Sequence, residues 1–287
     1  MVEKAINKTE RFLDGCAASL RGMEKLDGAA LKWVALITML IDHMAAVFEM
    51  GPTSIEWLLS LPSSALMAEY IMRLIGRTAF PIFAFVLVEG FVYTHNRRKH
   101  LISLCVFALL AEYPFDMAFF KGDEMGGCNV IVTMAFGFAM LMVLEAIWKC
   151  QGSPVRREEA WGGAEGDLVL PSSPLGWLQM CVKLLLCAAV VAAVCVVTTA
   201  INSDYSWLGV LTILLFYLLR RWRFLACIAV YLLLGAFISY EWYAIGGIFL
   251  ILCYNGKKGR QPKWLFYVFY PMHILILYWI RLAIFGA

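Results

Sequence analysis

Nine apolar runs separated by short polar segments leave this chain only one kind of fold. Of its 287 residues, 62% are hydrophobic and 16% are charged, a balance typical of a protein whose main solvent is lipid. Since a helix needs about 20 mostly apolar residues to cross a bilayer, each run is a candidate span. We therefore expect an all-α, polytopic transmembrane helical bundle of about nine spans, of which the sixth and eighth are short, near residues 30–49, 68–93, 99–120, 129–149, 176–200, 206–219, 223–240, 242–254 and 264–286.

The basic residues indicate how these spans are oriented. Five of them precede the first run, whereas residues 49–69 contain no Lys or Arg. Further basic groups lie at 95–99, 156–157, 220–223 and 255–263, in loops that share one side if the chain crosses at every run. Because cytoplasmic loops carry the excess of Lys and Arg, we expect a cytoplasmic N-terminus and an external C-terminus.

The soluble parts of the chain are small. Residues 1–28 are polar and lack the apolar core of a cleavable signal peptide, so we expect a cytoplasmic N-terminal segment. Residues 150–175, rich in Gly, Ser, Pro and mixed charge, predict a flexible cytoplasmic linker. This linker divides an N-terminal membrane half, 29–149, which holds the proposed catalytic core, from a C-terminal membrane half, 176–287.

Several classes of function are disfavoured by composition and motifs. A net charge of +3, spread over short loops, does not predict a nucleic-acid partner. The nine cysteines are scattered without a Cys-x-x-Cys pair and read as small core residues rather than a disulfide framework. The zinc motif His-Glu-x-x-His, the phosphate-binding P-loop and the Gly-x-Ser-x-Gly elbow are all missing, so we expect no metal and no such hydrolase or nucleotide chemistry.

Ionisable residues inside the apolar runs mark the candidate site. Asp42 and His43 fall in the outer half of the first span, where an ionisable side chain costs about 3 kcal/mol or more. His43 titrates near neutrality and is a candidate general base. Adjacent helical residues point about 100° apart, so Asp42 need not be the carboxylate that orients His43.

Two pairs with a spacing of four residues accompany that first pair. Arg73 and Arg77 lie on one face of the second span, and Glu112 and Asp116 repeat the spacing in the outer half of the third. We expect the two carboxylates to pair with the two arginines, and either of them is a candidate to orient the imidazole of the first span. His273 falls near mid-membrane in the last span, after a proline.

Each of these features also has a structural explanation. Intramembrane ion pairs can hold helices together without any chemistry, and a buried histidine can be bonded to a neighbouring helix. A transporter or proton-coupled channel would line its path with the same buried charges. A silent membrane scaffold is the third alternative.

A set of motifs in order resembles the TraX family, named for the F-pilin acetylase. The similarity is strong over residues 31–140 and looser over 204–281. It implies an integral membrane acetyltransferase of the bacterial inner membrane that takes an acetyl group from acetyl-CoA and places it on a free amine, such as the N-terminus of pilin. The residues that carry it are Leu31-Lys32, Ile37 to His43, Met72 to Phe85, Glu89-Gly90-Phe91, Thr94, Asn96, Glu112 to Asp116, Asn129, Asp204-Tyr205, Gly209, Tyr270-Pro271 and His273.

The layered charges and the resemblance together define the expected site. The acceptor, a peptide or a small molecule, would enter from outside, and acetyl-CoA would approach from the cytoplasm. The residues alone do not identify the acceptor, the acyl chain length or the oligomeric state, and they leave a general base and an acyl-histidine as alternatives. We expect catalytic roles for Asp42, His43, Arg73, Arg77, Glu112, Asp116 and His273, and donor binding by Glu89, Tyr93, Asn96, Arg97, Arg98, Lys99 and Tyr270.

Overall fold

The protein is a bundle of helices, described by a computed structural model over residues 11–15, 18–49, 63–120, 126–149, 174–260 and 263–285. Within these ranges no strand forms, only an isolated bridge between Leu26 and Tyr254. The elements are η1 (Arg21–Met23), α2 (Gly28–Glu49), α4 (Ser63–Gly76), α5 (Ala79–Tyr93), α6 (Arg97–Phe119), α7 (Val130–Lys149), α8 (Pro174–Ala200), α9 (Ser206–Leu218), α10 (Arg223–Phe237), η2 (Ser239–Ala244), α11 (Ile245–Leu252) and α12 (Lys263–Phe285).

Helices occupy all nine predicted runs, so the all-α membrane class is confirmed. Among the described residues, six segments are long and apolar enough to cross a bilayer: α2, α4 with α5, α6, α7, α8 and α12. Three further apolar segments are shorter: Ser206–Leu218, Arg223–Phe237 and Ser239–Leu252. The predicted linker lies outside the described residues except for 174–175, where α8 begins, and so do residues 1–10 of the N-terminal segment.

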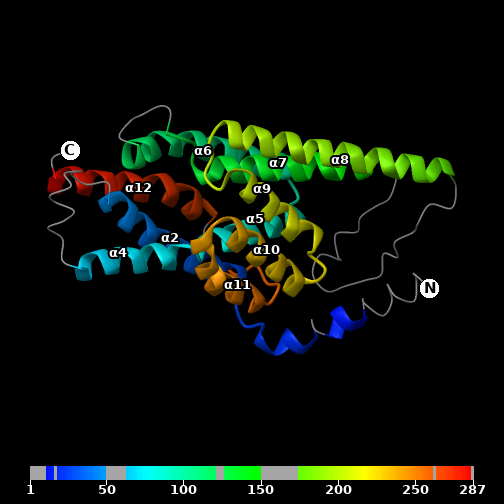
Figure 1. Ribbon diagram of the computed structural model, residues 1–287, viewed down its shortest axis with the longest axis horizontal. Helices are drawn as coiled ribbons and strands as arrows, with labels where there is room; N and C mark the ends of the chain where they lie inside the picture. Colours follow the sequence, from blue (N-terminus) through cyan, green and yellow to red (C-terminus); the bar gives the residue numbers. More distant parts are fainter. Residues whose placement is uncertain are drawn as a thin grey trace.

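Figure 1 shows the long helices running side by side along the longest axis of the molecule. Helix α2 contacts α4, α5 and α12, whereas α7 contacts α6, α8 and α9. The last helix, α12, packs on α2 and α6, so helices from both sides of the predicted linker share one core. Helix α8 contributes a single buried residue, Thr198, as expected for a helix that faces lipid.

The loops gather at two ends, which we name for the predicted orientation. At the inner end the N-terminal segment lies along the loop before α12: the Leu26 amide donates to the Cys253 carbonyl (2.9 Å) and the Gly28 amide to Lys257 (2.7 Å). At the outer end the Asp204 amide donates to the Cys128 carbonyl (2.9 Å). Loops predicted to share a side of the membrane therefore lie together.

The second predicted span is interrupted. Helices α4 and α5 are separated by a turn at Arg77 and Thr78, whose amides donate to Leu74 (3.2 Å) and Ile75 (3.1 Å). Pro81 lacks an N–H, so the Arg77 carbonyl loses its usual helical partner. Broken helices inside membranes are tolerated where they line a cavity, and this break faces one.

Candidate functional site

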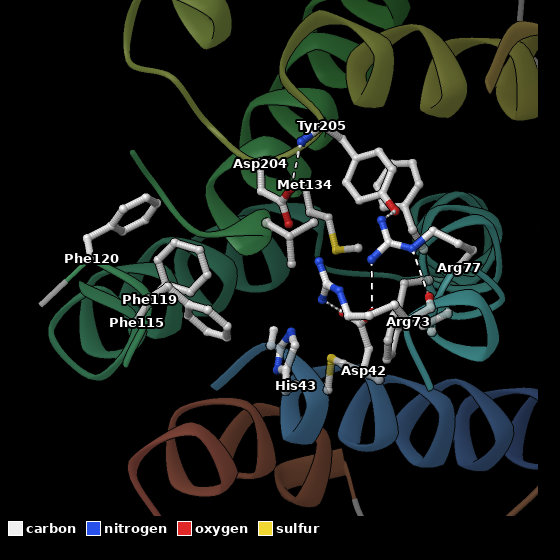
Figure 2. A pocket seen from close by; sticks show the side chains of 17 residues that line it. Asp42, His43, Arg73, Arg77, Phe115, Phe119, Phe120, Met134, Asp204 and Tyr205 are labelled. Carbon is white, nitrogen blue, oxygen red and sulfur yellow. Dashed lines mark hydrogen bonds and ion pairs between the residues drawn. The ribbon is translucent and has the colours of Figure 1, made fainter. Parts of the chain in front are cut away.

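A cavity of about 330 Å³ opens among α2, α4, α5, α6 and α7 beneath the loop that precedes α9 (Figure 2). We call it the outer cavity. Its apolar wall includes Met39, Phe80, Phe83 and three phenylalanines near the end of α6. Its polar lining is concentrated in six side chains, from three separate parts of the chain: Asp42, His43, Arg73, Arg77, Asp204 and Tyr205.

Asp42 binds both predicted arginines, one with each carboxylate oxygen. The distance is 2.9 Å from Oδ2 to Nη1 of Arg73 and 2.9 Å from Oδ1 to Nη2 of Arg77. Gly76 makes this approach possible, because a Cβ there would lie 2.3 Å from the Asp42 side chain. Both guanidinium groups therefore reach the same carboxylate on α2, although Arg77 lies in the turn that follows α4 and not in the same helix as Arg73.

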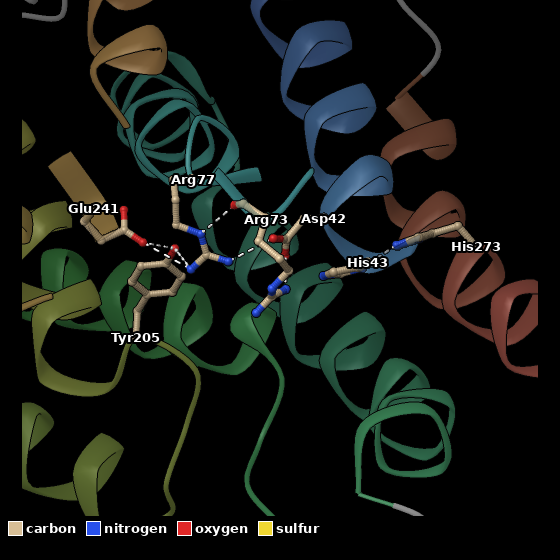
Figure 3. A network of polar contacts seen from close by, with 7 residues as sticks. All are labelled: Asp42, His43, Arg73, Arg77, Tyr205, Glu241 and His273. Atoms are coloured by element: carbon tan, nitrogen blue, oxygen red, sulfur yellow. Dashed lines mark hydrogen bonds and ion pairs between the residues drawn. The ribbon is translucent and has the colours of Figure 1, made fainter. Parts of the chain in front are cut away.

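Arg77 is held by four protein groups, of which Asp42 is one. Its Nη1 donates to Glu241 Oε1 (3.3 Å) and Tyr205 Oη (3.4 Å), and its Nε donates to the Arg73 carbonyl (3.2 Å). Tyr205 in turn donates to Glu241 Oε1 at 2.8 Å (Figure 3). Together these contacts join three elements: the turn between α4 and α5, the loop before α9, and the short helix η2.

Arg73 differs from Arg77 in exposure and in the number of its contacts. Its side chain is 36% exposed, against 15% for Arg77, and among the described residues its ion pair is with Asp42 alone. Its guanidinium reaches into the outer cavity, so it can offer further N–H donors to a ligand (Figure 2). Of the two arginines, Arg73 is therefore the one whose remaining N–H donors face the cavity.

His43 pairs with His273 rather than with a carboxylate. The Nδ1 of His43 lies 2.7 Å from Nε2 of His273, whose own Nδ1 lies 2.7 Å from the Phe269 carbonyl. Tyr270 flanks the pair, with its ring centroid 6.0 Å from that of His43. The first helix thus sends Asp42 toward the arginines and His43 toward α12, as the angle between adjacent helical residues allows.

The predicted pairing of Glu112 and Asp116 with the arginines is wrong. Glu112 accepts from the side chain of Asn129 and, at 3.4 Å, from its backbone amide. The same Asn129 donates to the Ala108 carbonyl (3.0 Å) and caps α7, so this cluster ties α6 to α7. Neither carboxylate lines the outer cavity, because Asp42 from the neighbouring helix α2 reaches the guanidinium groups directly.

A strained loop presents Asp204 to the outer cavity. Asn202, Tyr205 and Ser206 have positive φ angles of 50°, 57° and 43°, a conformation that needs surrounding contacts to hold it. Thr133 Oγ1 supplies one by donating to the Asp204 carbonyl at 2.5 Å. The carboxylate points into the cavity, and its partial removal from water raises the pKa of Asp204, against the opposing effect of Arg77 (Figure 2).

The seven predicted donor-binding residues lie in two places. Tyr270 is beside His43, whereas the others lie at or near the inner end of α5 and the start of α6. Arg97 pairs with Glu145 and donates to the Phe91 carbonyl (2.9 Å), and Asn96 caps α6 through the Lys99 amide (2.9 Å). Glu89 accepts from Tyr254 (2.7 Å), while Tyr93, Arg98 and Lys99 are exposed.

Four residues that are buried or line the outer cavity are not among the site residues predicted from the sequence. Glu241 is fully buried against Arg77, and Tyr205 and Asp204 line the outer cavity. Arg281 is 2% exposed and donates to the Ala118 and Met117 carbonyls at the end of α6. A charge inside an apolar run could have identified Glu241 and Arg281, since both fall within predicted spans or at their ends. Among the described residues, no group of three or more His, Cys, Asp and Glu side chains is arranged to hold a metal ion.

Comparison with known proteins gives one family and one relative. A family model described as TraX protein matches residues 27–281 of this chain. A probable fimbrial assembly protein FimC, serogroup H1, of Dichelobacter nodosus is 31% identical over 121 residues, which cover 39% of this chain and 44% of the relative. No solved structure matches the chain.

Proposed function

The chain belongs to the TraX family, and from that membership and the outer cavity we propose that this bacterial membrane protein is an acetyltransferase. It would move an acetyl group from acetyl-CoA to an amine, either a peptide N-terminus or a small acceptor. The observation that carries the proposal is that a possible base, His43, and an arginine with uncommitted donors, Arg73, line one cavity in the membrane region. Ion pairs that only joined helices would not need such a cavity.

The two side chains have complementary roles in acetyl transfer. His43 removes a proton as the amine nitrogen attacks the thioester carbonyl. Arg73 donates to the oxygen of the tetrahedral intermediate, whose charge it stabilises. The new C–N bond forms, the C–S bond breaks, and the CoA thiolate leaves and takes up a proton.

Asp204 supports an amine rather than a hydroxyl as the acceptor. In the ion-pair network two arginines are balanced by Asp42 and Glu241, so Asp204 adds a negative charge that the network does not need. A protonated amine supplies the matching positive charge, and Asp204 would hold it at the cavity; the ammonium group loses one proton to solvent before the neutral amine attacks and gives its second proton to His43. A neutral alcohol gains nothing comparable from this carboxylate.

The donor would approach from the inner end. Arg98 and Lys99 are exposed there and can attract the phosphates of acetyl-CoA. On that side the outer cavity is bounded by Met39, Phe80 and Phe83, so these side chains must move apart for the thioester to reach His43. The transfer would thus need a gating step between donor binding and chemistry.

The name of the relative supports a particular kind of acceptor. It is a probable fimbrial assembly protein, and a fimbrial subunit offers a free N-terminal amine. We propose a pilus subunit N-terminus as one acceptor that this chain would modify.

Reconstitution tests the proposal directly. Purified protein in liposomes receives acetyl-CoA labelled with ¹³C in the acetyl group and a short peptide that begins with alanine. We expect labelled, N-acetylated peptide by mass spectrometry, formed only with the protein present. Absence of product together with flux of a labelled solute in the absence of CoA would reject the enzyme in favour of a transporter.

A further inference from the structure

We propose that His273 is a positioning residue that sets the tautomer of His43, so that the unprotonated Nε2 of His43 faces the outer cavity. The catalytic consequence rests on the proposed acetyl transfer, whereas the tautomer itself does not. The proposal comes from a chain of three groups: the Phe269 carbonyl, His273 and His43.

The Phe269 carbonyl determines which nitrogen of His273 carries the proton. A backbone carbonyl can only accept a hydrogen bond, and the Phe269 oxygen lies 2.7 Å from Nδ1 of His273. That nitrogen must therefore carry the proton. In a neutral imidazole the other nitrogen, Nε2, is then a bare acceptor.

His273 in turn determines which nitrogen of His43 carries the proton. His43 Nδ1 lies 2.7 Å from this acceptor, so it must be the donor. The two rings are inclined by only 7° with centroids 5.0 Å apart, so they lie edge to edge in nearly one plane and the N–H points at its partner. Nε2 of His43 is consequently left without a proton.

That free nitrogen faces the reactants. His43 lines the outer cavity, and its second nitrogen points away from His273 toward Arg73 (Figure 3). The Phe119 and Tyr270 rings contact its edges at 5.3 and 6.0 Å between centroids. Asp42, the adjacent carboxylate, is held by the arginines and does not compete for the imidazole.

The arrangement keeps the proton balance simple. The acceptor amine gives its proton to Nε2 of His43, whose Nδ1–H stays donated to His273 throughout, so His273 neither gains nor loses a proton. If His43 adopted the other tautomer, it would present an N–H to the cavity and could not accept. His273 thus acts through His43 without touching the substrate.

Nuclear magnetic resonance can observe the tautomer without any substrate. The chain has four histidines, and ¹⁵N-histidine labelling of the protein in lipid nanodiscs, with His43→Gln for assignment, isolates the relevant signals. We expect a protonated Nδ1 and an unprotonated Nε2 for His43. In His273→Leu the signals should shift toward the Nε2–H form, and an unchanged pattern would overturn the proposal.

Kinetics of two substitutions then separate positioning from folding. His273→Leu should lower kcat for acetyl transfer roughly a hundredfold at an unchanged KM for the peptide, because the wrong tautomer is inactive. His273→Gln places an amide oxygen where Nε2 was and should recover most of that loss. His95→Gln, at the inner end, is the control and should leave the rate unchanged. If His273→Gln is as slow as His273→Leu while both proteins melt at the wild-type temperature, the tautomer role is wrong.

If acetyl transfer is absent from every variant and the wild type, but the spectra show the expected tautomers, the proposed function fails and the positioning contact stands.

Discussion

Buried charges occur at both ends of this bundle, but they are used differently. At the inner end several buried or half-buried charges meet protein partners: Arg97 pairs with Glu145, Arg223 with Glu24, and Glu89 accepts from Tyr254. None of these side chains lines the outer cavity. In the outer cavity, by contrast, Arg73 points N–H donors, and His43 a ring nitrogen, into the open space of the cavity.

The difference shows that burial alone does not mark a functional group in a membrane protein. An arginine that is bound by protein groups on several sides joins helices, as Arg77 does between Asp42 and Glu241. A charged side chain that is paired with one protein group and has other donors facing a cavity can act on a ligand, as Arg73 can. Substitutions at the two kinds of position should therefore separate stability from activity.

The largest expected effect is at His43. His43→Ala removes the base and should lower the rate of acetyl transfer about 10² to 10⁴-fold with little change in melting temperature. His100→Gln, a histidine near the start of α6 and outside the outer cavity, is the matched control and should keep wild-type turnover. Equal rates in His43→Ala and wild type would show that His43 is not the base, and the outer cavity would then not differ in function from the inner end.

Next comes a comparison of the two arginines. Arg77→Met leaves Glu241 buried without its cation, so we expect a loss of about 3–5 kcal/mol in stability and a low yield of folded protein. Arg73→Met should fold and should lose about 10² to 10³-fold in kcat, because the oxyanion loses a donor. Thermal melting and turnover of both purified proteins are the measurements. The same loss of folded protein in both variants would favour a purely structural role.

A third, smaller effect tests the acceptor class. Asp204→Asn should raise KM for alaninamide about tenfold, since one charge-assisted contact is lost. Lactamide, the hydroxyl isostere, should bind equally weakly to both proteins. Asp14→Asn, whose carboxylate binds Trp222 at the inner end, is the control. Preserved discrimination between alaninamide and lactamide in Asp204→Asn would exclude this carboxylate as the ammonium site.

The smallest expected effect lies at the inner end. Replacing Arg98 and Lys99 together by Gln should raise KM for acetyl-CoA several-fold at low salt and much less at high salt, because exposed charges attract phosphates only weakly. Turnover at saturating donor should not change. A salt-independent effect would show that phosphate attraction is not their role.

The nine helical segments could be predicted because apolar length and composition report them directly. The same is true of Asp42, His43, Arg73, Arg77 and His273, which stand out as ionisable residues in apolar runs. Their partners could not be predicted, because any carboxylate at a similar depth suits an arginine equally well. Glu112 has the right depth and spacing, yet Asn129 binds it, and the choice depends on how the helices pack.

The break in the second span has a local cause that the apolar pattern hides. Its hydropathy is continuous across Arg77 and Thr78, and only Gly76 and Pro81 indicate a turn. The role of the loop before α9 depends on backbone conformation at Tyr205, which hydropathy does not report. Charge patterns thus predict which residues are unusual, whereas three-dimensional packing determines what they contact.

A structure with a bound bisubstrate compound would show whether acetyl transfer takes place in the outer cavity. The compound would join the CoA sulfur to the amine of an alanine dipeptide through a two-carbon acetyl bridge. We expect the bridge to lie in the outer cavity, with the dipeptide nitrogen within hydrogen-bond distance of His43 Nε2 and the bridge oxygen beside Arg73. A bridge bound away from both side chains would contradict this expectation.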